Sequence, residues 1–187
     1  MTLDSPVNLR QVPPEPLTGV KPGPDAPAHQ GRVLVFGATG YIGTHLVARL
    51  LREGVPVRAV GRSRAVLEAR HWPGVEIVVA DALQPQTLPA ALQGVDTAYY
   101  LVHSMAAGRD FGRLDLEAAD HFAAAAAEAS VRRIVYLGGL IPEQADSEHL
   151  VSRRDTGVRL RAGPVPVTEI RAGIIVGPGS AAYEVMR

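Results

Sequence analysis

Apolar residues in this chain fall into short continuous runs that alternate with stretches of helical periodicity from Arg32 onward. Short continuous apolar runs are typical of strands buried on both faces, whereas apolar positions three and four apart are typical of one helix face. We therefore expect strands at residues 33–36, 55–60, 75–80, 97–102, 133–137 and 167–172. We expect helices at residues 41–52, 64–71, 85–92, 111–130 and 146–161, and a further helix beginning after a turn at residues 177–179.

This alternation of strands and helices predicts the fold class. Successive strands joined by helices form a parallel sheet, because each right-handed crossover carries the chain across one face of the sheet. We expect an α/β fold, a Rossmann-like doubly wound parallel sheet with the strand order 3-2-1-4-5-6 and helices on both faces.

The first part of the chain lacks this pattern. Residues 1–30 are rich in proline and show no apolar periodicity. We interpret them as a disordered proline-rich tail, for which the alternative is a proline-rich docking peptide. The remaining residues, 31–187, are expected to form one Rossmann domain.

The turn after the first expected strand carries Gly37, Gly40 and Gly43, and the third glycine already lies inside the expected first helix. In such a transition the first glycine permits the tight turn, the second lets the backbone approach a pyrophosphate, and the third lets the helix pack close to the strand. The start of the helix adds free N–H groups and a positive dipole end. The turn thus predicts a dinucleotide site; the alternative is a turn that merely joins two elements. The residues expected to contact the dinucleotide here are Gly37, Thr39, Gly40, Tyr41, Ile42 and Gly43.

The end of the second expected strand indicates which dinucleotide is bound. An acidic residue at this place would hold the ribose 2′-hydroxyl of NAD, but the sequence there has Arg62 and Arg64 and no carboxylate. Guanidinium groups can neutralise a 2′-phosphate and stack on adenine. We therefore expect NADP as the cofactor, with NAD as the alternative, unless both arginines are only a solvated helix start.

Composition excludes several function classes. The chain has 187 residues, no cysteine and a formal net charge of zero, which argues against thiolate catalysis and nucleic-acid binding. The six histidines show no metal-ligand spacing, so no metal site is expected. No apolar run could cross a bilayer, and no signal peptide is evident, so we expect a cytoplasmic protein. Lys21 is the only lysine.

The glycine turn, read as Gly-Ala-Thr-Gly-Tyr-Ile-Gly over residues 37–43, resembles the short-chain dehydrogenase/reductase superfamily in its extended and atypical branches. Together with the runs at residues 99–105, 136–140 and 168–180, it is similar to bacterial NmrA-like NAD(P)H-binding proteins. The resemblance implies that an aspartate after the third strand, here in Asp81-Ala82, accepts a hydrogen bond from the adenine amino group; the alternative role for Asp81 is the N-cap of the next helix. It also implies that the loop after the fourth strand, with Leu101, His103 and Ser104, passes the nicotinamide ribose.

The resemblance leaves the catalytic residues open. Reductases of the superfamily use a tyrosine and a lysine four residues later, on the helix after the fifth strand, and a serine at the end of that strand. In this chain the corresponding helix has His149 and Arg153, four residues apart and thus on one face. We assign these two residues as the catalytic candidates, for which the alternative is an exposed pair without a role. Gly138 stands near the serine position, where it offers a backbone N–H or leaves room for the nicotinamide.

We expect an NADPH-dependent reductase of the atypical type, acting on a small carbonyl, enone or quinone. The alternative is a non-catalytic module that senses NAD(P) and signals to a regulatory partner; a structural subunit is a third reading. Members of the resembled group continue beyond the point that corresponds to Arg187, so we expect the substrate-closing segment to be missing here. A nicotinamide dinucleotide and a small substrate are the expected partners, with a homo-oligomer as a further option.

Overall fold

The computed structural model describes residues 31–103, 110–141, 147–180 and 183. These residues belong to two compact units that meet in sequence between Gly173 and Ile174, and each unit is described by itself. The expected proline-rich tail lies outside the described residues, and its assignment and the single domain over residues 31–187 stay predictions.

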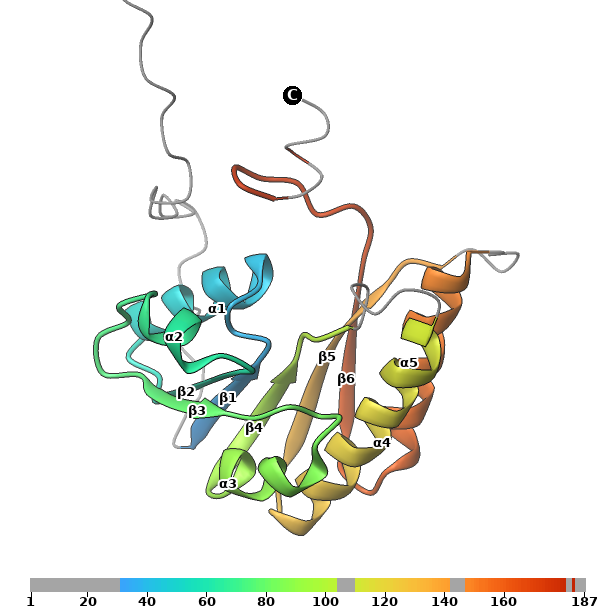
Figure 1. The fold of residues 1–187 in the computed structure, drawn as a ribbon, viewed down its shortest axis with the longest axis horizontal. Coiled ribbons are helices and arrows are strands. Elements are labelled where there is room, and N and C mark those ends of the chain that lie inside the picture. The colour runs from blue at the N-terminus through green and yellow to red at the C-terminus, as the bar shows by residue number, and fades with distance from the viewer. Residues whose placement is uncertain (1–30, 104–109, 142–146, 181–182, 184–187) are drawn as a thin grey trace, which may run out of the picture. The chain divides into compact units, whose positions relative to one another are not determined.

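The first unit contains a six-stranded parallel sheet with the order β3-β2-β1-β4-β5-β6 (Figure 1). The predicted fold class and strand order are therefore confirmed. The strands are β1 (Arg32–Phe36), β2 (Val57–Gly61), β3 (Glu76–Val79), β4 (Val95–Tyr100), β5 (Arg133–Gly139) and β6 (Val167–Ala172).

Both faces of the central strand β1 are buried, which explains its continuous apolar sequence. Val33 and Val35 pack into one hydrophobic core, whereas Leu34 and Phe36 pack into the other. Because successive side chains of a strand point to opposite faces, a strand between two layers of helices needs apolar residues at every position.

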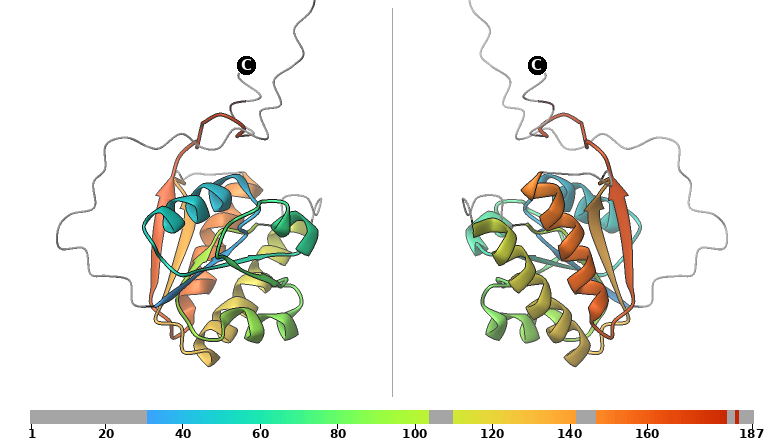
Figure 2. Two further views of the ribbon diagram at one scale, coloured as in Figure 1. Left: turned by 90° about the vertical axis from the view of Figure 1, so that its left-hand side faces the viewer. Right: turned by 90° about the vertical axis from the view of Figure 1, so that its right-hand side faces the viewer.

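Helices form the two outer layers, as the sequence predicts. They are α1 (Tyr41–Arg52), α2 (Arg64–Glu68), the 3₁₀ helix η2 (Pro85–Thr87), α3 (Leu88–Leu92), α4 (Phe111–Glu128) and α5 (Glu148–Ala162). Residues of α1 and α2 share one core with β1 and β2, and residues of α3, α4 and α5 share the other core with β1, β4 and β5. Figure 2 shows α4 and α5 side by side over the second core.

Some boundaries differ from the prediction for local reasons. The second strand begins at Val57 rather than at residue 55, because the N–H of Val55 donates to the carbonyl of Leu50 at 3.0 Å and ends helix α1. Pro56 has no N–H to donate to a neighbouring strand. Helix α2 ends at Glu68 rather than at residue 71, because the last turn tightens and His71 takes a φ of +50°.

Arg58 is a buried cation inside a strand whose sequence is otherwise apolar. Its guanidinium Nη1 donates to the carbonyls of Ala91 at 2.6 Å and Gln93 at 2.8 Å, at the end of α3. Its Nη2 pairs with Glu76 on β3 at 2.9 Å. The last carbonyls of a helix have no partner within the helix, so this arginine satisfies them from the neighbouring strand.

The described residues of the second unit, 174–180 and 183, include the turn predicted at residues 177–179. The N–H of Ser180 donates to the carbonyl of Gly177 at 2.9 Å, and the Ser180 hydroxyl accepts from the N–H of Tyr183 at 3.2 Å. The helix expected after this turn lies mostly outside the described residues.

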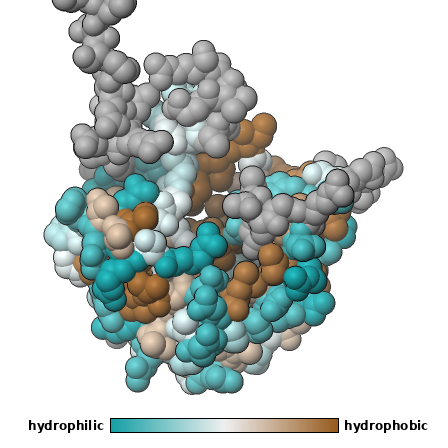
Figure 3. Space-filling view, viewed as in Figure 1, coloured by the Kyte–Doolittle hydropathy of each residue, from teal (hydrophilic) through white to brown (hydrophobic). Residues whose placement is uncertain are grey.

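Hydrophilic side chains cover much of the face in Figure 3, and hydrophobic ones appear between them in separate groups. No helix in the described part of the chain is long and apolar enough to cross a membrane.

Candidate functional site

The glycine turn folds back onto the neighbouring strand. Gly37 has a φ of +93°, a conformation that residues with a Cβ rarely adopt. Its N–H and that of Ala38 both donate to the carbonyl of Val60 at 3.0 Å, and the N–H of Gly40 donates to the carbonyl of Gly37 at 3.1 Å. These bonds hold the turn at the carboxyl ends of β1 and β2.

Gly43 is required by close packing of helix against turn. A Cβ at this position would lie 2.3 Å from the carbonyl oxygen of Gly37 and 2.8 Å from the Cα of Ala38. Both neighbours are backbone atoms, so neither can rotate away. The role that the spacing predicts for the third glycine is thus visible in the fold.

Gly40 has a different environment. A Cβ there would meet only the carbonyl oxygen of Gly37, at 3.4 Å, among the described atoms, so the fold itself tolerates a methyl group. Gly40 is also the N-cap of α1, which has no side-chain cap and no acidic residue in its first turn. The first N–H groups of a helix lack partners within it and attract anions. The turn therefore fits a pyrophosphate that approaches the backbone at Gly40.

Arg62 and Arg64 follow β2, beside the glycine turn. A Cβ on Gly61 would lie 3.5 Å from the Thr39 methyl group, so the end of β2 and the turn adjoin. Arg62 is exposed, and no carboxylate of the described residues pairs with it within 4.0 Å. Arg64 is also exposed and pairs with Glu68 at 3.4 Å. An exposed helix pair of this kind contributes little stability, so both guanidinium groups remain available to an anion.

Arg70 joins this region, although the sequence did not single it out. Its guanidinium Nη2 donates to the carbonyl oxygen of Thr39 at 2.7 Å. The two residues are 31 positions apart, and nothing in the local sequence pattern connects them.

Asp81 lies at the end of β3 and forms a tight turn. Its Oδ1 accepts the N–H of Leu83 at 3.0 Å, and its own N–H donates to the hydroxyl of Thr87, also at 3.0 Å. The alternative role as N-cap of the next helix is wrong, because Gln84 occupies that position. Ala82 is buried, and its carbonyl accepts from Nδ1 of His121 at 2.8 Å. The adenine contact assigned to Asp81 and Ala82 stays a prediction.

The carboxyl end of β4 adjoins the glycine turn and carries two candidate residues. The N–H of Leu101 donates to the carbonyl of Phe36 at 3.0 Å, and a Cβ on Gly37 would lie 3.1 Å from the Leu101 carbonyl oxygen. His103 follows two residues later. Ser104, in the same predicted loop, lies outside the described residues.

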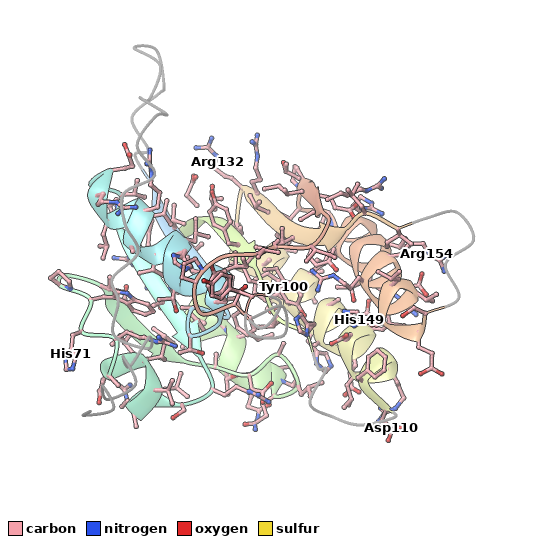
Figure 4. The ribbon with its side chains drawn as sticks, turned by 90° about the horizontal axis from the view of Figure 1, so that it is seen from above. His71, Tyr100, Asp110, Arg132, His149 and Arg154 are labelled. Carbon is pink, nitrogen blue, oxygen red and sulfur yellow. The ribbon has the colours of Figure 1, made fainter. Side chains whose placement is uncertain are left out.

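His103, in the segment after β4, and His149, on α5, meet at this edge of the sheet. Their ring centroids are 5.9 Å apart in an edge-to-face arrangement, and Phe111 lies 6.2 Å from the His149 ring. Figure 4 labels His149 and shows His71 at the opposite side of the view. Partial desolvation and then the charge of Arg153 lower the pKa of His103, while Asp115 opposes this shift.

Arg153 is held against strand β5. Its Nη2 donates to the carbonyl of Leu137 at 2.8 Å, and the hydroxyl of Tyr136 donates to the carbonyl of Arg153 at 2.8 Å. Burial raises the pKa of Tyr136 to about 12, against the opposing charge of Arg153. His149 and Arg153 thus share one face of α5, as the spacing predicts, and both approach the carboxyl end of the sheet.

Gly138 is small for a reason that the sequence did not indicate. A Cβ there would lie 2.6 Å from Oε1 of Glu169 on β6, so that carboxylate fills the space beside the glycine. Glu169 is held by Arg161 and by Arg171, the latter at 3.4 Å. Both roles considered for Gly138, room for the nicotinamide and donation by its backbone N–H, stay predictions.

Ser152 on α5 and Asp115 on α4 form a buried polar pair. The hydroxyl of Ser152 donates to Oδ2 of Asp115 at 2.9 Å and links α5 to α4. The side chains are 4% and 5% exposed, so their hydrogen bond is shielded from water. Asp115 lies on the core-facing side of α4 with Ala118 and Phe122. A polar residue among the apolar positions of a helix is the sequence signal that could have identified Asp115.

A sequence model of the NAD(P)H-binding family matches residues 37–158 of this chain. That stretch runs from the first glycine of the turn to the middle of α5 and includes both histidines. The chain belongs to the NAD(P)H-binding family. The resemblance inferred from the glycine turn is thereby confirmed, and the cofactor of this NAD(P)H-binding chain is a nicotinamide dinucleotide.

Two curated relatives of this NAD(P)H-binding chain are reductases. It is 34% identical over 140 residues to the chloroplastic divinyl chlorophyllide a 8-vinyl-reductase of Zea mays, covering 68% of this chain and 35% of the relative. It is 33% identical over 141 residues to the (4-alkanoyl-5-oxo-2,5-dihydrofuran-3-yl)methyl phosphate reductase of Streptomyces griseus, covering 74% and 46%. The chain thus spans less than half the length of these relatives.

A solved structure shares the fold of the NAD(P)H-binding chain. The triphenylmethane reductase of Citrobacter sp., crystallised with NADP(H), superposes with a TM-score of 0.65 and 26% identity. The match covers 74% of this chain and 48% of the reductase.

Proposed function

We propose that this chain is the dinucleotide-binding part of an NADPH-dependent reductase that acts on a small carbonyl, enone or quinone. The observation that carries the proposal is the placement of the His103–His149 pair beyond β4, the strand whose end also adjoins the glycine turn. Substrates of Rossmann-type enzymes bind at this carboxyl edge of the sheet. The reductase names of the relatives support the same reaction class.

Each part of the dinucleotide has a group of residues that would hold it. The pyrophosphate would lie on the backbone at Gly40 and the first N–H groups of α1, those of Tyr41, Ile42 and Gly43. Arg62 and Arg64 would bind the 2′-phosphate, which favours NADPH over NADH. Asp81 and Ala82 would contact the adenine, and Leu101, His103 and Gly138 the nicotinamide ribose. When bound, the cofactor supplies the hydride.

The chain's own residues would supply the proton and the orientation. His149 would donate a ring proton to the substrate oxygen that gains negative charge, because histidine is the side chain that most often serves as a general acid. Arg153, one helical turn further along α5, would orient that oxygen through its remaining donors. Burial and the Arg153 charge lower the pKa of His103, which favours the neutral form of this neighbouring ring.

The missing tyrosine–lysine pair favours conjugated acceptors over simple ketones. Lys21 is the only lysine, so no lysine can follow a tyrosine on α5. A simple ketone needs a strong proton donor as hydride reaches its carbon, whereas an enone or quinone spreads the negative charge over several atoms. The two curated relatives are named for a vinyl group and for an oxo-dihydrofuran, which are acceptors of this kind.

NADPH oxidation in the presence of enones, quinones and ketones tests the proposal. We expect turnover with at least one conjugated acceptor, and a fall of about 100-fold in kcat for His149→Ala with NADPH affinity unchanged, the usual size of general acid catalysis. His71→Asn is the matched control, because His71 is an exposed histidine with a φ of +50°, which asparagine tolerates. Full activity of His149→Ala would remove this residue from the mechanism.

A specific observation favours a second candidate, a module that binds NAD(P) without turning it over and signals to a partner. The Arg153 guanidinium is already engaged by the Leu137 carbonyl at 2.8 Å, and no serine, tyrosine or lysine stands at the usual catalytic positions. Tight NADPH binding without oxidation of NADPH by any acceptor would support this reading.

A further inference from the structure

We propose that Arg70 is a specificity-determining residue that binds the 2′-phosphate of NADPH together with Arg62. This inference rests on the proposed preference for NADPH and adds to it a residue from a separate part of the chain. The observation behind it is the hydrogen bond from Arg70 to the glycine turn.

The backbone fixes the place from which Arg70 reaches. Its N–H donates to the carbonyl of Leu67 at 3.2 Å, and the N–H of His71 donates to the carbonyl of Glu68 at 3.0 Å. These bonds close the last turn of α2, after which His71 reverses the chain with a φ of +50°. Arg70 therefore projects from a defined helix end, and its side chain crosses to the carbonyl of Thr39 at 2.7 Å.

Thr39 marks the position of the adenosine ribose. It lies between Gly37 and Gly40 in the turn, and its methyl group would be 3.5 Å from a Cβ on Gly61 at the end of β2. Rossmann folds bind this ribose at the end of the second strand, beside the glycine turn. A guanidinium that spans from the end of α2 to Thr39 thus stands beside the place of the 2′-oxygen.

Arg70 has donors to spare for an anion. A guanidinium carries five N–H donors, and the Thr39 carbonyl engages one nitrogen only. Within the described part of the chain, no carboxylate lies within ion-pair distance of Arg70, whereas Arg64 in the preceding helix α2 pairs with Glu68 at 3.4 Å. A phosphate is the ligand that suits a planar, charged donor held by one hydrogen bond.

The test separates binding of the phosphate from support of the turn. Arg70→Gln keeps a donor for the Thr39 carbonyl but loses the charge, and Arg70→Lys keeps the charge but loses the planar donor set. Calorimetric titration should show NADPH binding about tenfold more weakly to Arg70→Gln, with NADH binding unchanged, and an intermediate loss for Arg70→Lys. Arg49→Gln is the matched control, because Arg49 is a similarly placed helix-end arginine, paired with Glu53 at 2.8 Å.

Each other outcome has a defined meaning. Equal losses for NADPH and NADH would show that Arg70 only supports the turn, and would overturn the inference. An unchanged NADPH to NADH ratio in Arg70→Gln would also overturn it, while the proposed preference for NADPH would survive if the wild type shows that preference. A wild type that binds neither nucleotide would overturn the proposed function as well.

A second measurement does not depend on the variants being folded. We expect the side-chain Nε–H signal of Arg70 in the NMR spectrum of the wild type to shift on addition of 2′,5′-ADP and to stay in place with 5′-ADP. The same response to both nucleotides would contradict a role in binding the 2′-phosphate.

Discussion

Two alanine substitutions in the glycine turn should affect different properties: Gly43→Ala should lower the stability of the fold, and Gly40→Ala should lower the affinity for the nucleotide. In Gly43→Ala the new Cβ would lie 2.3 Å from the Gly37 carbonyl oxygen and 2.8 Å from the Ala38 Cα. Helix α1 must then move by about 1 Å to restore ordinary contact distances, and both neighbours belong to the backbone. In Gly40→Ala the only contact within 4 Å among the described atoms is at 3.4 Å, so the fold needs no movement.

The magnitudes follow from these contacts. Overpacking of this kind costs about 3 kcal/mol, so Gly43→Ala should lower the melting temperature by about 10 °C. Gly40→Ala changes only the residue type at an N-cap and should cost less than about 1 kcal/mol. Its methyl group, however, projects where the pyrophosphate must approach, so NADPH should bind at least about tenfold more weakly.

Urea unfolding followed by circular dichroism gives the stability of each variant, and calorimetric titration gives its affinity for NADPH. Gly112→Ala is the stability control, because Gly112 lies in α4 with no described atom within 4 Å of an added Cβ. Alanine there should be neutral or stabilise by up to about 1 kcal/mol. The reasoning would be refuted by wild-type stability of Gly43→Ala, or by wild-type NADPH affinity of Gly40→Ala.

Three further predictions concern the polar groups between α4, α5 and the sheet. Ser152→Ala should lower the free energy of unfolding by about 1–3 kcal/mol, because buried Asp115 loses its hydroxyl donor; urea unfolding measures this, and a loss below about 0.5 kcal/mol would contradict it. Arg153→Gln should raise the pKa of His103, since the Arg153 charge lowers it, and an NMR titration that leaves this pKa unchanged would argue against their proximity. Tyr136 holds its proton more tightly when folded, with a pKa of about 12 against 10 unfolded, so its contribution to stability is present below pH 10 and is lost between pH 10 and 12. Unfolding of Tyr136→Phe should therefore depend less on pH in that window than unfolding of the wild type.

The sequence by itself determined the fold class, the strand order and the glycine turn between β1 and α1. These depend on local patterns. The apolar run at residues 33–36 must be covered on both faces of its strand. The turn requires a positive φ at Gly37 and leaves no room for a Cβ at Gly43. Right-handed crossovers then leave few ways to arrange the strands. The predicted ends of some elements were wrong, as at the start of β2 near Pro56, because single hydrogen bonds set these ends and leave no trace in the apolar periodicity.

Tertiary structure alone decided which distant residues meet. Arg70 reaches Thr39 across 31 positions, Ser152 reaches Asp115 across 37, and Glu169 from β6 fills the space beside Gly138. Each contact depends on how far a side chain extends from its element and on what the neighbouring element offers there. Such pairings leave no period in the sequence, because the two partners lie far apart along the chain and belong to different elements. They become apparent only when the crossovers have placed the carboxyl ends of the strands together.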